Sequence, residues 1–471
     1  MLYSLAGKKE GKIYMKKLWS VFLSTFMLLL MMTPIAFAAT EEVPKVDSGD
    51  TAWVLISAAL VFIMTPGLGF FYGGMVRSKN VLTTIMHSFF IVGLISVEWI
   101  ILGYTMAFGD DATGVIPGII GSLDKIGLAG TAGQIWTGTS IPELAFVIFQ
   151  CMFAVITPAL ITGAFAERVK FKAYVLFMLL WTIFIYNPMA HMVWGGGKLF
   201  ELGALDFAGG LVIHILSGVS GLTLCILIGK RRGYGKLPIL PHHLPMTVLG
   251  AALLWFGWFG FNAGSALGAN ELASSAFVAT QAAAAMATVS WVFCEWIRNG
   301  KPTTLGAASG CIAGLVAITP AAGFVAPIPA VIIGLVAGAV CYFAVAVLKN
   351  KLGYDDSLDA FGVHGIGGTW GALATGLWAT TAVNPAGADG LFYGDGNLLS
   401  AQVISIIVAY LLGSIGTFII YKIVNAITPF RVSEAEEISG LDIVEHGERG
   451  YSHSLMTGES LGVQNDLTKT N

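Results

Sequence analysis

The sequence predicts an all-α protein that crosses a membrane many times. Three observations carry this prediction: 56% of the 471 residues are hydrophobic, only 11% are charged, and the apolar residues gather in long runs. Soluble domains carry roughly 25% charged residues, so this chain lacks the polar surface that a soluble protein of this size needs. The 59 glycines agree with the prediction, because small residues let membrane helices pack closely.

The charge balance and the cysteines exclude other classes of protein. Lysine and arginine number 25 against 28 aspartates and glutamates, so the basic surplus of a nucleic-acid-binding protein is missing. The five cysteines all fall inside apolar runs, and none has the spacing of metal ligands. We therefore expect buried thiols, with no disulfide framework, metal site or cofactor.

The N-terminus has the order of a secretory signal peptide. Five lysines precede an apolar stretch at 18–32, and Ala36-Phe37-Ala38 follows as a small-residue cleavage site. We expect cleavage after Ala38, so that residues 1–38 are the signal peptide and 39–51 a short extracellular N-terminus. The alternative is a retained first helix. Met15 stands directly before Lys16, so translation starting at Met15 is a second open point.

The remaining chain divides into a membrane domain at 52–427 and a polar tail at 428–471. A spanning helix needs about 20 largely apolar residues. The runs are uniformly apolar and lack the period-two alternation of a β-barrel. Eleven segments meet the length requirement, and the eighth is the shortest. They lie at about 52–76, 84–108, 143–167, 172–194, 207–229, 244–266, 273–297, 304–320, 327–348, 359–382 and 399–427.

The basic residues of the loops predict the orientation in the membrane. Cytoplasmic loops carry an excess of lysine and arginine. One set of loops holds only Lys125 and Lys198, and the opposite set holds all the others. We therefore expect the N-terminus outside, the tail in the cytoplasm and a multi-pass protein of the plasma membrane. The basic set is Arg77, Lys79, Arg168, Lys170, Lys172, Lys230, Arg231, Arg232, Lys236, Arg298, Lys301, Lys349 and Lys351.

An internal repeat connects the fifth and tenth segments. Asp206 precedes His214 by eight residues, and Asp356 precedes His364 by the same spacing. The chain therefore divides into two five-helix halves plus a final helix, and five is odd, so the second half is inverted. Inverted repeats are typical of transport proteins, with the working site between the halves. Each histidine lies about 12 Å into its helix, so the two are expected to meet near the midplane. The alternative is that each is a polar packing residue.

Several long motifs then resemble one family. The chain is similar to ammonium transporters of the Amt/Mep/Rh family, on the Amt branch, from about residue 50 to 451. The resemblance implies a homotrimer with one narrow pore per subunit, and ammonium or ammonia as the substrate, with methylammonium left open. The motifs are GAFAER at 163–168, AHMVWGGG at 190–197, GALDFAGG at 203–210, WFGWFGFNAGS at 255–265, FGVHG at 361–365 and GLDIVEHGE at 440–448.

The resemblance also implies residue roles. Trp194 and Ser265 form an outer ammonium-binding site, to which Phe149 adds a ring. Phe153 and Phe261 stack below them as a gate. Apart from the resemblance, Trp194 is equally well an interfacial aromatic, and the phenylalanines are ordinary apolar residues.

Further roles follow from the same resemblance. His214 and His364 are the twin histidines of the pore, and Asp206 supports the binding site from behind. Trp258 and Thr319 lie in the vicinity of the pore.

These residue types suit the passage of ammonia. Moving a bare cation into hydrocarbon costs tens of kcal/mol, and the neutral molecule avoids that cost. An indole face attracts a cation by about 0.5–2 kcal/mol, and a hydroxyl can accept one hydrogen bond from it. A histidine in a dry pore is expected to be neutral, because burial disfavours the charged form. We expect net charge transfer.

Three alternatives and one partner remain to be considered. An ammonium sensor would carry a fused signalling domain or altered pore residues, and neither is found here. A membrane enzyme would need a catalytic constellation that the chain lacks, so no catalytic residue is expected. A carbon dioxide channel is disfavoured by Trp194 and Ser265. The tail at 428–471 resembles a regulatory tail that docks a PII-type signal protein, although Gly450 replaces the alanine usual before Tyr451.

Overall fold

The structure is a computed structural model that describes residues 45–451. The expected signal peptide and its cleavage site lie outside the described residues, as does the tail beyond Tyr451. Within residues 45–451 there is no β-strand, and only isolated β-bridges interrupt the helices and loops. The chain is therefore all-helical over its described length.

Nine helical segments of the described chain are long and apolar enough to cross a membrane. Each corresponds to one of the predicted spans, although several begin or end some residues away from the predicted bounds. They are Ser48–Met75, Ser78–Phe108, Glu143–Phe165, Phe171–Glu201, Gly210–Ile228, Leu244–Gly264, Glu271–Asn299, Pro327–Leu352 and Asn397–Ile427.

The other two predicted spans form shorter helices. The segment predicted at 304–320 is the helix Thr304–Ile318, which has 15 residues and ends before Pro320. Proline has no backbone N–H to donate, so Pro320 cannot continue the hydrogen bonds of the helix beyond this point. The segment predicted at 359–382 is helical from Phe361 to Trp378. The structure thus contains helices at all eleven positions, nine of which have the length and composition of a span.

Several long helices contain more than one labelled element, because π-helical turns interrupt them; the label η marks both π-helical and 3₁₀ segments. The helices up to the middle of the chain are α2 (Ser48–Met75), α3 (Val81–Glu98), α4 (Tyr104–Phe108), α5 (Glu143–Phe165), α6 (Phe171–Trp181), α7 (Asn187–Trp194), α8 (Lys198–Glu201), η5 (Gly210–Ile215), α9 (Leu216–Ile228) and α10 (Leu244–Gly264). They are followed by α11 (Glu271–Asn299), α12 (Thr304–Ile318), α13 (Pro327–Phe343), η6 (Ala344–Leu348), α14 (Lys349–Leu352), η7 (Phe361–Gly365), α15 (Ile366–Trp378), α16 (Asn397–Leu411), α17 (Thr417–Ile427), α18 (Glu434–Ser439) and η10 (Asp442–His446).

Side chains at the helix starts explain several of these bounds. The side chain of Asn270 accepts the N–H of Ala273 at the start of α11, and Thr303 accepts the N–H of Gly306 at the start of α12. Such caps pair backbone donors that the helix itself leaves free. The helix α11 ends at Gly300, whose φ of 73° is the left-handed conformation that glycine adopts easily.

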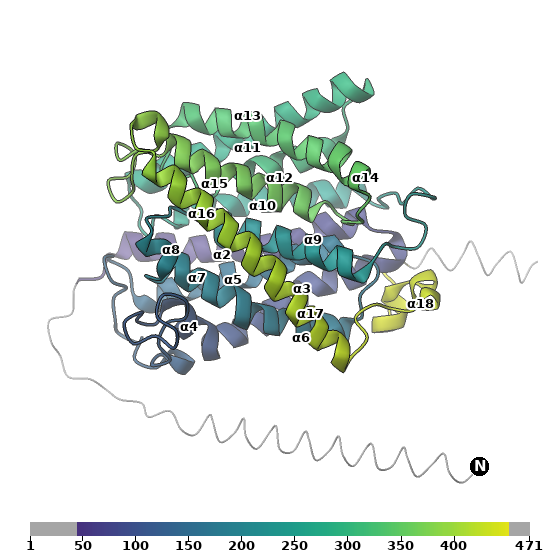
Figure 1. The fold of residues 1–471 in the computed structure, drawn as a ribbon, viewed down its shortest axis with the longest axis horizontal. Coiled ribbons are helices and arrows are strands. Elements are labelled where there is room, and N and C mark those ends of the chain that lie inside the picture. Colours follow the sequence, from purple (N-terminus) through teal and green to yellow (C-terminus); the bar gives the residue numbers. More distant parts are fainter. Residues whose placement is uncertain (1–44, 452–471) are drawn as a thin grey trace, which may run out of the picture. The chain divides into compact units, whose positions relative to one another are not determined.

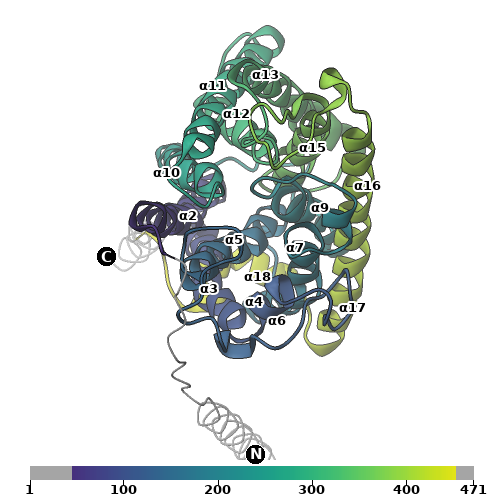
Figure 2. The ribbon, with the colours of Figure 1, turned by 90° about the vertical axis from the view of Figure 1, so that its left-hand side faces the viewer.

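The helices form a bundle around a buried centre (Figures 1 and 2). Viewed from its end in Figure 2, the bundle has α10–α13 and α15 on one side and α3–α7 on the other. The pair α16 and α17 runs along the outside, and Figure 1 shows it crossing the bundle obliquely. The helices α2 and α10 pack against each other along their length, as do α11, α12 and α13.

The described part of the tail packs against one end of the bundle, which we call the tail end. The carboxylate of Asp442 accepts the N–H groups of Leu82 and Thr83 at the start of α3, at 3.0 and 2.8 Å. Glu445 accepts the N–H of Phe171 at the start of α6. Carboxylates stabilise helix N-termini because the free N–H groups carry partial positive charge. We call the other end of the bundle the distal end.

Candidate functional site

The helix η5–α9 begins at the distal end on the carboxylate of Asp206. This side chain accepts four successive N–H groups, those of residues 209–212, at 2.6–3.2 Å. Its own carbonyl accepts the indole N–H of Trp194 at 2.8 Å. Asp206 therefore fixes the start of the helix and, through its backbone, the tryptophan that ends α7. The residue is buried, so this arrangement is part of the protein interior.

The helix η7–α15 begins at the tail end in the same way. The carboxylate of Asp356 accepts the N–H groups of Ala360 and Phe361 at 3.1 and 2.8 Å. The neighbouring Asp355 is paired with Arg231, which follows the last residue of α9 closely in the chain. One helix thus starts where the other ends, so the two run in opposite directions. The sequence repeat indicated this relation, although it did not identify Asp356 as a functional residue.

Glycines let these two helices cross in close contact. A Cβ added at Gly218 would lie 2.6 Å from the Cα of Gly365 and would also overlap its backbone nitrogen. A Cβ added at Gly368 would lie 3.0 Å from the Cβ of His214. Cβ atoms do not approach other atoms this closely, so only glycine allows the crossing. The crossing lies beside the two histidines and brings them together.

His214 and His364 face each other at the centre of the bundle. Their Nδ1 atoms are 3.3 Å apart, and the ring centroids are separated by 5.3 Å with the planes inclined by 21°. Both residues are almost completely buried. Among the described residues, the Nε2 atom of His214 has no hydrogen-bond partner. A buried polar atom without a partner is costly, which marks this atom as available for a transient one.

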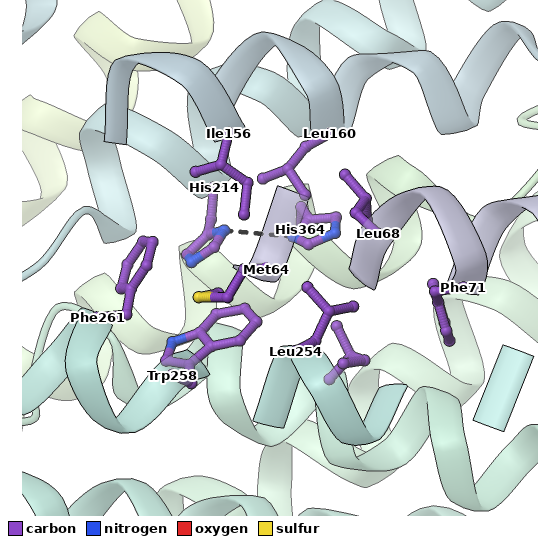
Figure 3. A pocket seen from close by; sticks show the side chains of 11 residues that line it. Met64, Leu68, Phe71, Ile156, Leu160, His214, Leu254, Trp258, Phe261 and His364 are labelled. Atoms are coloured by element: carbon purple, nitrogen blue, oxygen red, sulfur yellow. Dashed lines mark hydrogen bonds between the residues drawn. The ribbon is translucent and has the colours of Figure 1, made fainter. Parts of the chain in front are cut away.

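A small cavity lies against the two histidines (Figure 3). Its volume is about 10 Å³, close to the smallest space that holds one water-sized molecule. We call it the central cavity. Apart from the histidines, its lining is apolar or aromatic and consists of Met64, Leu68, Phe71, Ile156, Leu160, Leu254, Trp258, Phe261 and Ile312.

Sequence reasoning did not single out most of this apolar wall. Leucine, isoleucine and methionine on a membrane helix are ordinary residues, and nothing in their spacing separates a lining position from a packing position. Of the lining residues, only Trp258, Phe261 and the histidines were predicted to lie at the pore. The rest are identified by the structure alone.

Trp258 forms one side of the central cavity, and Thr319 supports it from behind. The indole ring lies 5.4 Å from the ring of His214 with the planes inclined by 24°. Its N–H donates to the Thr319 hydroxyl at 2.9 Å, and that hydroxyl donates to the carbonyl of Leu315. Thr319 does not line the cavity. It therefore acts on the site by holding the tryptophan.

Phe153 and Phe261 close the space between the central cavity and the distal end. Their ring centroids are 4.4 Å apart, and the ring of Phe261 lies 6.1 Å from that of His214. On the other side, Phe153 meets Trp194 edge to face at 6.3 Å. The order along this line is therefore tryptophan, phenylalanine pair and histidine, and both phenylalanines are buried.

The distal end of this line is partly open. Trp194 and Ser265 are both partly buried, in contrast to the fully buried rings below them. The Ser265 hydroxyl donates to the carbonyl of Phe261, one helical turn earlier, which leaves its oxygen able to accept a hydrogen bond. Phe149 contacts Phe153 at 4.8 Å between ring centroids, and it lies against Gly264 beside the serine.

A second buried polar group lies at the tail end. Glu167 accepts hydrogen bonds from Arg77 at 3.0 Å and from Arg231 at 3.1 Å. Asp355 pairs with Arg231 at 2.8 Å and with Arg168 at 3.4 Å. We call these five residues the tail-end cluster. Glu167 stands next to Arg168 in the chain, but its ion partners are the two other arginines.

The pKa values of the two acids reflect this pairing. Burial alone would raise the pKa of Glu167, but the hydrogen bond from Arg77 and the charge of Arg231 outweigh it and hold the pKa below its ordinary value. At Asp355, burial also acts to raise the pKa. The hydrogen bond from Arg231 and the charges of the nearby arginines outweigh it, so the pKa of this carboxyl lies below its ordinary value. Both acids are therefore charged at neutral pH.

Comparison with known proteins relates this arrangement to one family. Residues 52–451 match the Ammonium Transporter Family. An ammonium transporter of Bacillus subtilis (strain 168) is 54% identical over 408 residues, which are 86% of this chain and 99% of the relative. Amt1 of Archaeoglobus fulgidus is 48% identical over 86% of this chain and its own full length.

Solved structures agree with the fold. The crystal structure of Saccharomyces cerevisiae Mep2 superposes with a TM-score of 0.78 at 36% identity, covering 83% of this chain and 89% of the other. A sensor Amt protein superposes with the same TM-score at 28% identity, covering 84% of this chain and 98% of the other.

Proposed function

Because the chain belongs to the ammonium transporter family, we propose that it moves ammonium across the plasma membrane by capturing the cation, removing a proton and conducting neutral ammonia. Ammonium transport itself follows from family membership and the named relatives. The mechanism is our proposal. It is supported by the sequence of sites along one line: a partly open aromatic and hydroxyl site, a closed ring pair, and a dry cavity with two histidines.

Capture takes place at Trp194 and Ser265. The indole face attracts a small cation by about 0.5–2 kcal/mol, which is enough to favour it and too little to retain it. The Ser265 oxygen accepts one N–H of the cation, since its own proton is engaged with a backbone carbonyl. Phe149 adds apolar surface behind the serine. Asp206 stays one layer back, where its four N–H partners occupy its oxygens.

The ring pair and the cavity favour the neutral form. A bare ammonium ion in hydrocarbon would lose tens of kcal/mol of hydration free energy. Phe153 and Phe261 bury the passage, and the central cavity offers too little volume for a hydrated cation. The cation therefore gives up a proton at the ring pair, ammonia passes into the central cavity, and the histidine pair beside Phe261 takes up the proton.

The histidine pair provides a donor and an acceptor in this dry space. If both rings are neutral, one Nδ1 donates to the other across the 3.3 Å contact. The ring whose Nδ1 donates then has an accepting Nε2, and the other ring has a donating Nε2. Ammonia both donates and accepts hydrogen bonds, so this pair matches it. The same chain of hydrogen bonds can relay a proton, and we propose net charge transfer on this basis.

We further propose the arrangement in the membrane. Eleven spans, organised as two inverted five-helix halves plus a final helix, place the N-terminus outside and the tail in the cytoplasm. The antiparallel helices of His214 and His364 and the arginines and lysines of the tail end support this arrangement. A homotrimer with one pore per subunit follows the family pattern. A cleaved signal peptide at 1–38 remains part of the proposal.

The contact between His214 and His364 beside the central cavity carries the proposal, and a transport assay tests it. Ammonium-evoked current is measured in vesicles that contain the parent protein, His214→Ala or Ser265→Leu. We expect His214→Ala to abolish ammonium conduction and Ser265→Leu to weaken it at low ammonium. Gly93→Ala is the control, because a Cβ at this position meets no atom within 4 Å. Full conduction in His214→Ala would overturn the proposal, and uptake without current would reject net charge transfer.

A sensor is the second candidate function, favoured by the likeness to a solved sensor Amt protein. A sensor would bind ammonium at Trp194 and Ser265 and conduct little. The same vesicle assay separates the two functions, since a sensor gives binding without current or uptake. Growth of a transport-deficient cell on low ammonium provides an independent readout.

We also propose that the tail docks a PII-type signal protein at the tail end. The segment Asp442–His446 is folded against α3 and α6, so it presents a defined surface. A pull-down with a PII protein in its low-nitrogen and high-nitrogen ligand states tests this. Binding in neither state would reject it.

A further inference from the structure

A groove separate from the central cavity opens on the side of the bundle at the tail end. Its volume is about 630 Å³. Leu222 and Ile226 of α9 line one side, and Leu348 and Leu352 at η6 and α14 line the other. Ile226 is 61% exposed and Leu352 is 65% exposed, so the groove faces outward from the bundle. In a membrane protein, such a surface meets lipid chains.

The groove is apolar along its length and has an unpaired cation at its mouth. Lys230 follows α9 directly, and its Nζ atom lies 3.6 Å from the position of a Cβ on Gly353. It also lies 5.6 Å from the centroid of the Tyr234 ring. No ion pair within residues 45–451 includes Lys230. The acid at the mouth, Asp355, is already neutralised by two arginines, so it leaves the lysine free for another anion.

A buried hydroxyl in the groove also lacks a partner. The hydroxyl oxygen of Tyr354 has no hydrogen-bond partner in the described chain, although it is inaccessible to solvent. The ring of this residue lines the groove and lies against Phe361. Its carbonyl is engaged with the Tyr234 hydroxyl at 2.8 Å, so the tyrosine is held in place. Tyr354 therefore forms a fixed part of the groove wall, and its solvent-inaccessible hydroxyl lies out of reach of a ligand in the groove.

We propose that this groove binds one anionic phospholipid of the leaflet at the tail end. An acyl chain lies between Leu222, Ile226 and Leu352, and the phosphate lies at Lys230. The ring of Tyr354 forms part of the wall beside the chain. Lys230 lies eight residues after Leu222, which corresponds to about 12 Å along a helix. This distance places the groove in the outer part of the hydrocarbon layer. Basic pockets between spanning helices bind anionic head groups for the same electrostatic reason.

The charge of the mouth selects this occupant over a neutral lipid. A lysine near an anionic membrane surface contributes about 1 kcal/mol, or a factor of about five in affinity. Lys351 stands one position before Leu352 and is exposed, so it adds to the positive potential at the mouth. A neutral lipid would fill the apolar part equally well but would leave the lysine unpaired.

The groove also touches both helices of the histidine pair. The helix α9 continues from η5, which carries His214, and Phe361 stands three residues before His364. A bound lipid therefore contacts the two elements whose crossing holds the central cavity. This inference concerns lipid binding and does not depend on ammonium conduction, so its failure and that of the proposed function are distinguishable.

The experiment measures lipid binding to the full chain in detergent by native mass spectrometry. Phosphatidylglycerol and phosphatidylcholine with the same acyl chains are titrated separately. We expect the parent to prefer phosphatidylglycerol at one site, and Lys230→Gln to reduce that preference about fivefold. Lys230→Arg should retain the preference. Lys236→Gln is the matched control, because it removes an exposed lysine of the same loop that does not line the groove.

A second variant tests the apolar part. Ile226→Trp fills the groove from an exposed position and should fold normally, and we expect it to lose the tight site for phosphatidylglycerol. Equal preference in the parent and Lys230→Gln would overturn the proposal, as would equal binding of the two lipids by the parent. Inorganic phosphate that binds at Lys230 without lipid would show an ion site and would overturn it too.

Discussion

The central cavity and the tail-end cluster are both buried and polar, but they treat their polar atoms differently. In the tail-end cluster, the carboxylates of Glu167 and Asp355 are surrounded by the guanidinium groups of three arginines. At the central cavity, the two imidazoles contact each other through their Nδ1 atoms. The Nε2 atom of His214 has no protein partner within the described residues. Within the described residues, every carboxylate oxygen of the first group has an arginine partner, although Arg77 Nη2 and Arg168 Nε lack a hydrogen bond, and the second group leaves an imidazole nitrogen unpaired.

This difference follows from what each group has to do. A closed network of charges and hydrogen bonds holds the loops of the tail end in one arrangement. Under the proposed function, an incomplete pair keeps donors and acceptors available for a passing molecule, and its cost is borne by the packing around it. On this proposal, buried polar groups serve rigidity at one end of the molecule and passage at its centre.

Removal of one member of the tail-end cluster should have the largest effect on stability. Glu167→Ala leaves Arg77 and Arg231 without their common acid, and breaking a buried ion pair in this way costs about 3–5 kcal/mol. Glu434→Ala is the control, because its pair with Arg232 is exposed and contributes about 1 kcal/mol or less. Thermal unfolding in detergent measures both. Equal losses would mean that the closed cluster is not specially stabilising.

Loss of the cap at Asp206 should come second. Asp206→Ala leaves four N–H groups without their acceptor at a buried helix start, and we expect a loss of about 2 kcal/mol together with reduced conduction. Asp206→Asn keeps one acceptor oxygen and should recover part of the stability. If Asp206→Asn and Asp206→Ala lower the unfolding temperature equally, the hydrogen bonds from the backbone to the carboxylate are not what stabilises this helix start.

A change at the helix crossing should affect conduction more than stability. Gly218→Ala forces the helices of His214 and His364 apart, because the new Cβ overlaps the backbone of Gly365. Overpacking of this kind costs about 1–3 kcal/mol. We expect a folded protein with strongly reduced ammonium current. Gly93→Ala, where a Cβ meets no atom within 4 Å, should match the parent or be slightly more stable. Equal currents in the two variants would contradict the importance of the crossing.

Nine of the predicted spans coincide with long apolar helices of the described chain, and the predicted aromatic and histidine residues lie on one line from Trp194 to His364. The length of an apolar run can be read directly from the sequence, and it indicates the length of the spanning helix. The nine helices long enough to span a membrane lie at such runs. The family motifs then indicated which aromatic and histidine residues to expect near the pore. The roles of these residues remain predictions until transport is measured.

Contacts between distant segments were beyond sequence reasoning. Asp442 caps α3 some 360 positions earlier in the chain, and nothing in its surroundings indicates that partner. The groove beside Lys230 also forms only because α9 and α14 lie close together in the fold. The histidines lie in π-helical turns, η5 and η7, which no periodicity in the sequence predicts. Such features arise from packing and not from local preference.

Acid should produce the smallest effect, and it should be confined to the tail end. The pKa values of Glu167 and Asp355 in the folded protein lie below their ordinary values of 4.5 and 3.8. The unfolded chain therefore takes up protons first as the pH falls. The stabilisation from these acids is complete above pH 4.5 and decreases only as the pH falls through the folded pKa values.

Limited proteolysis of the tail measures this acid effect. We expect no change in cleavage between about pH 7 and pH 5 and faster cleavage in stronger acid. Asp355→Asn removes one titrating group, so its profile should be flatter, whereas Glu434→Gln, in the exposed pair, should follow the parent. Tail release that begins near neutral pH would require a group outside the tail-end cluster. The contrast between the tail-end cluster and the histidine pair would then need another basis.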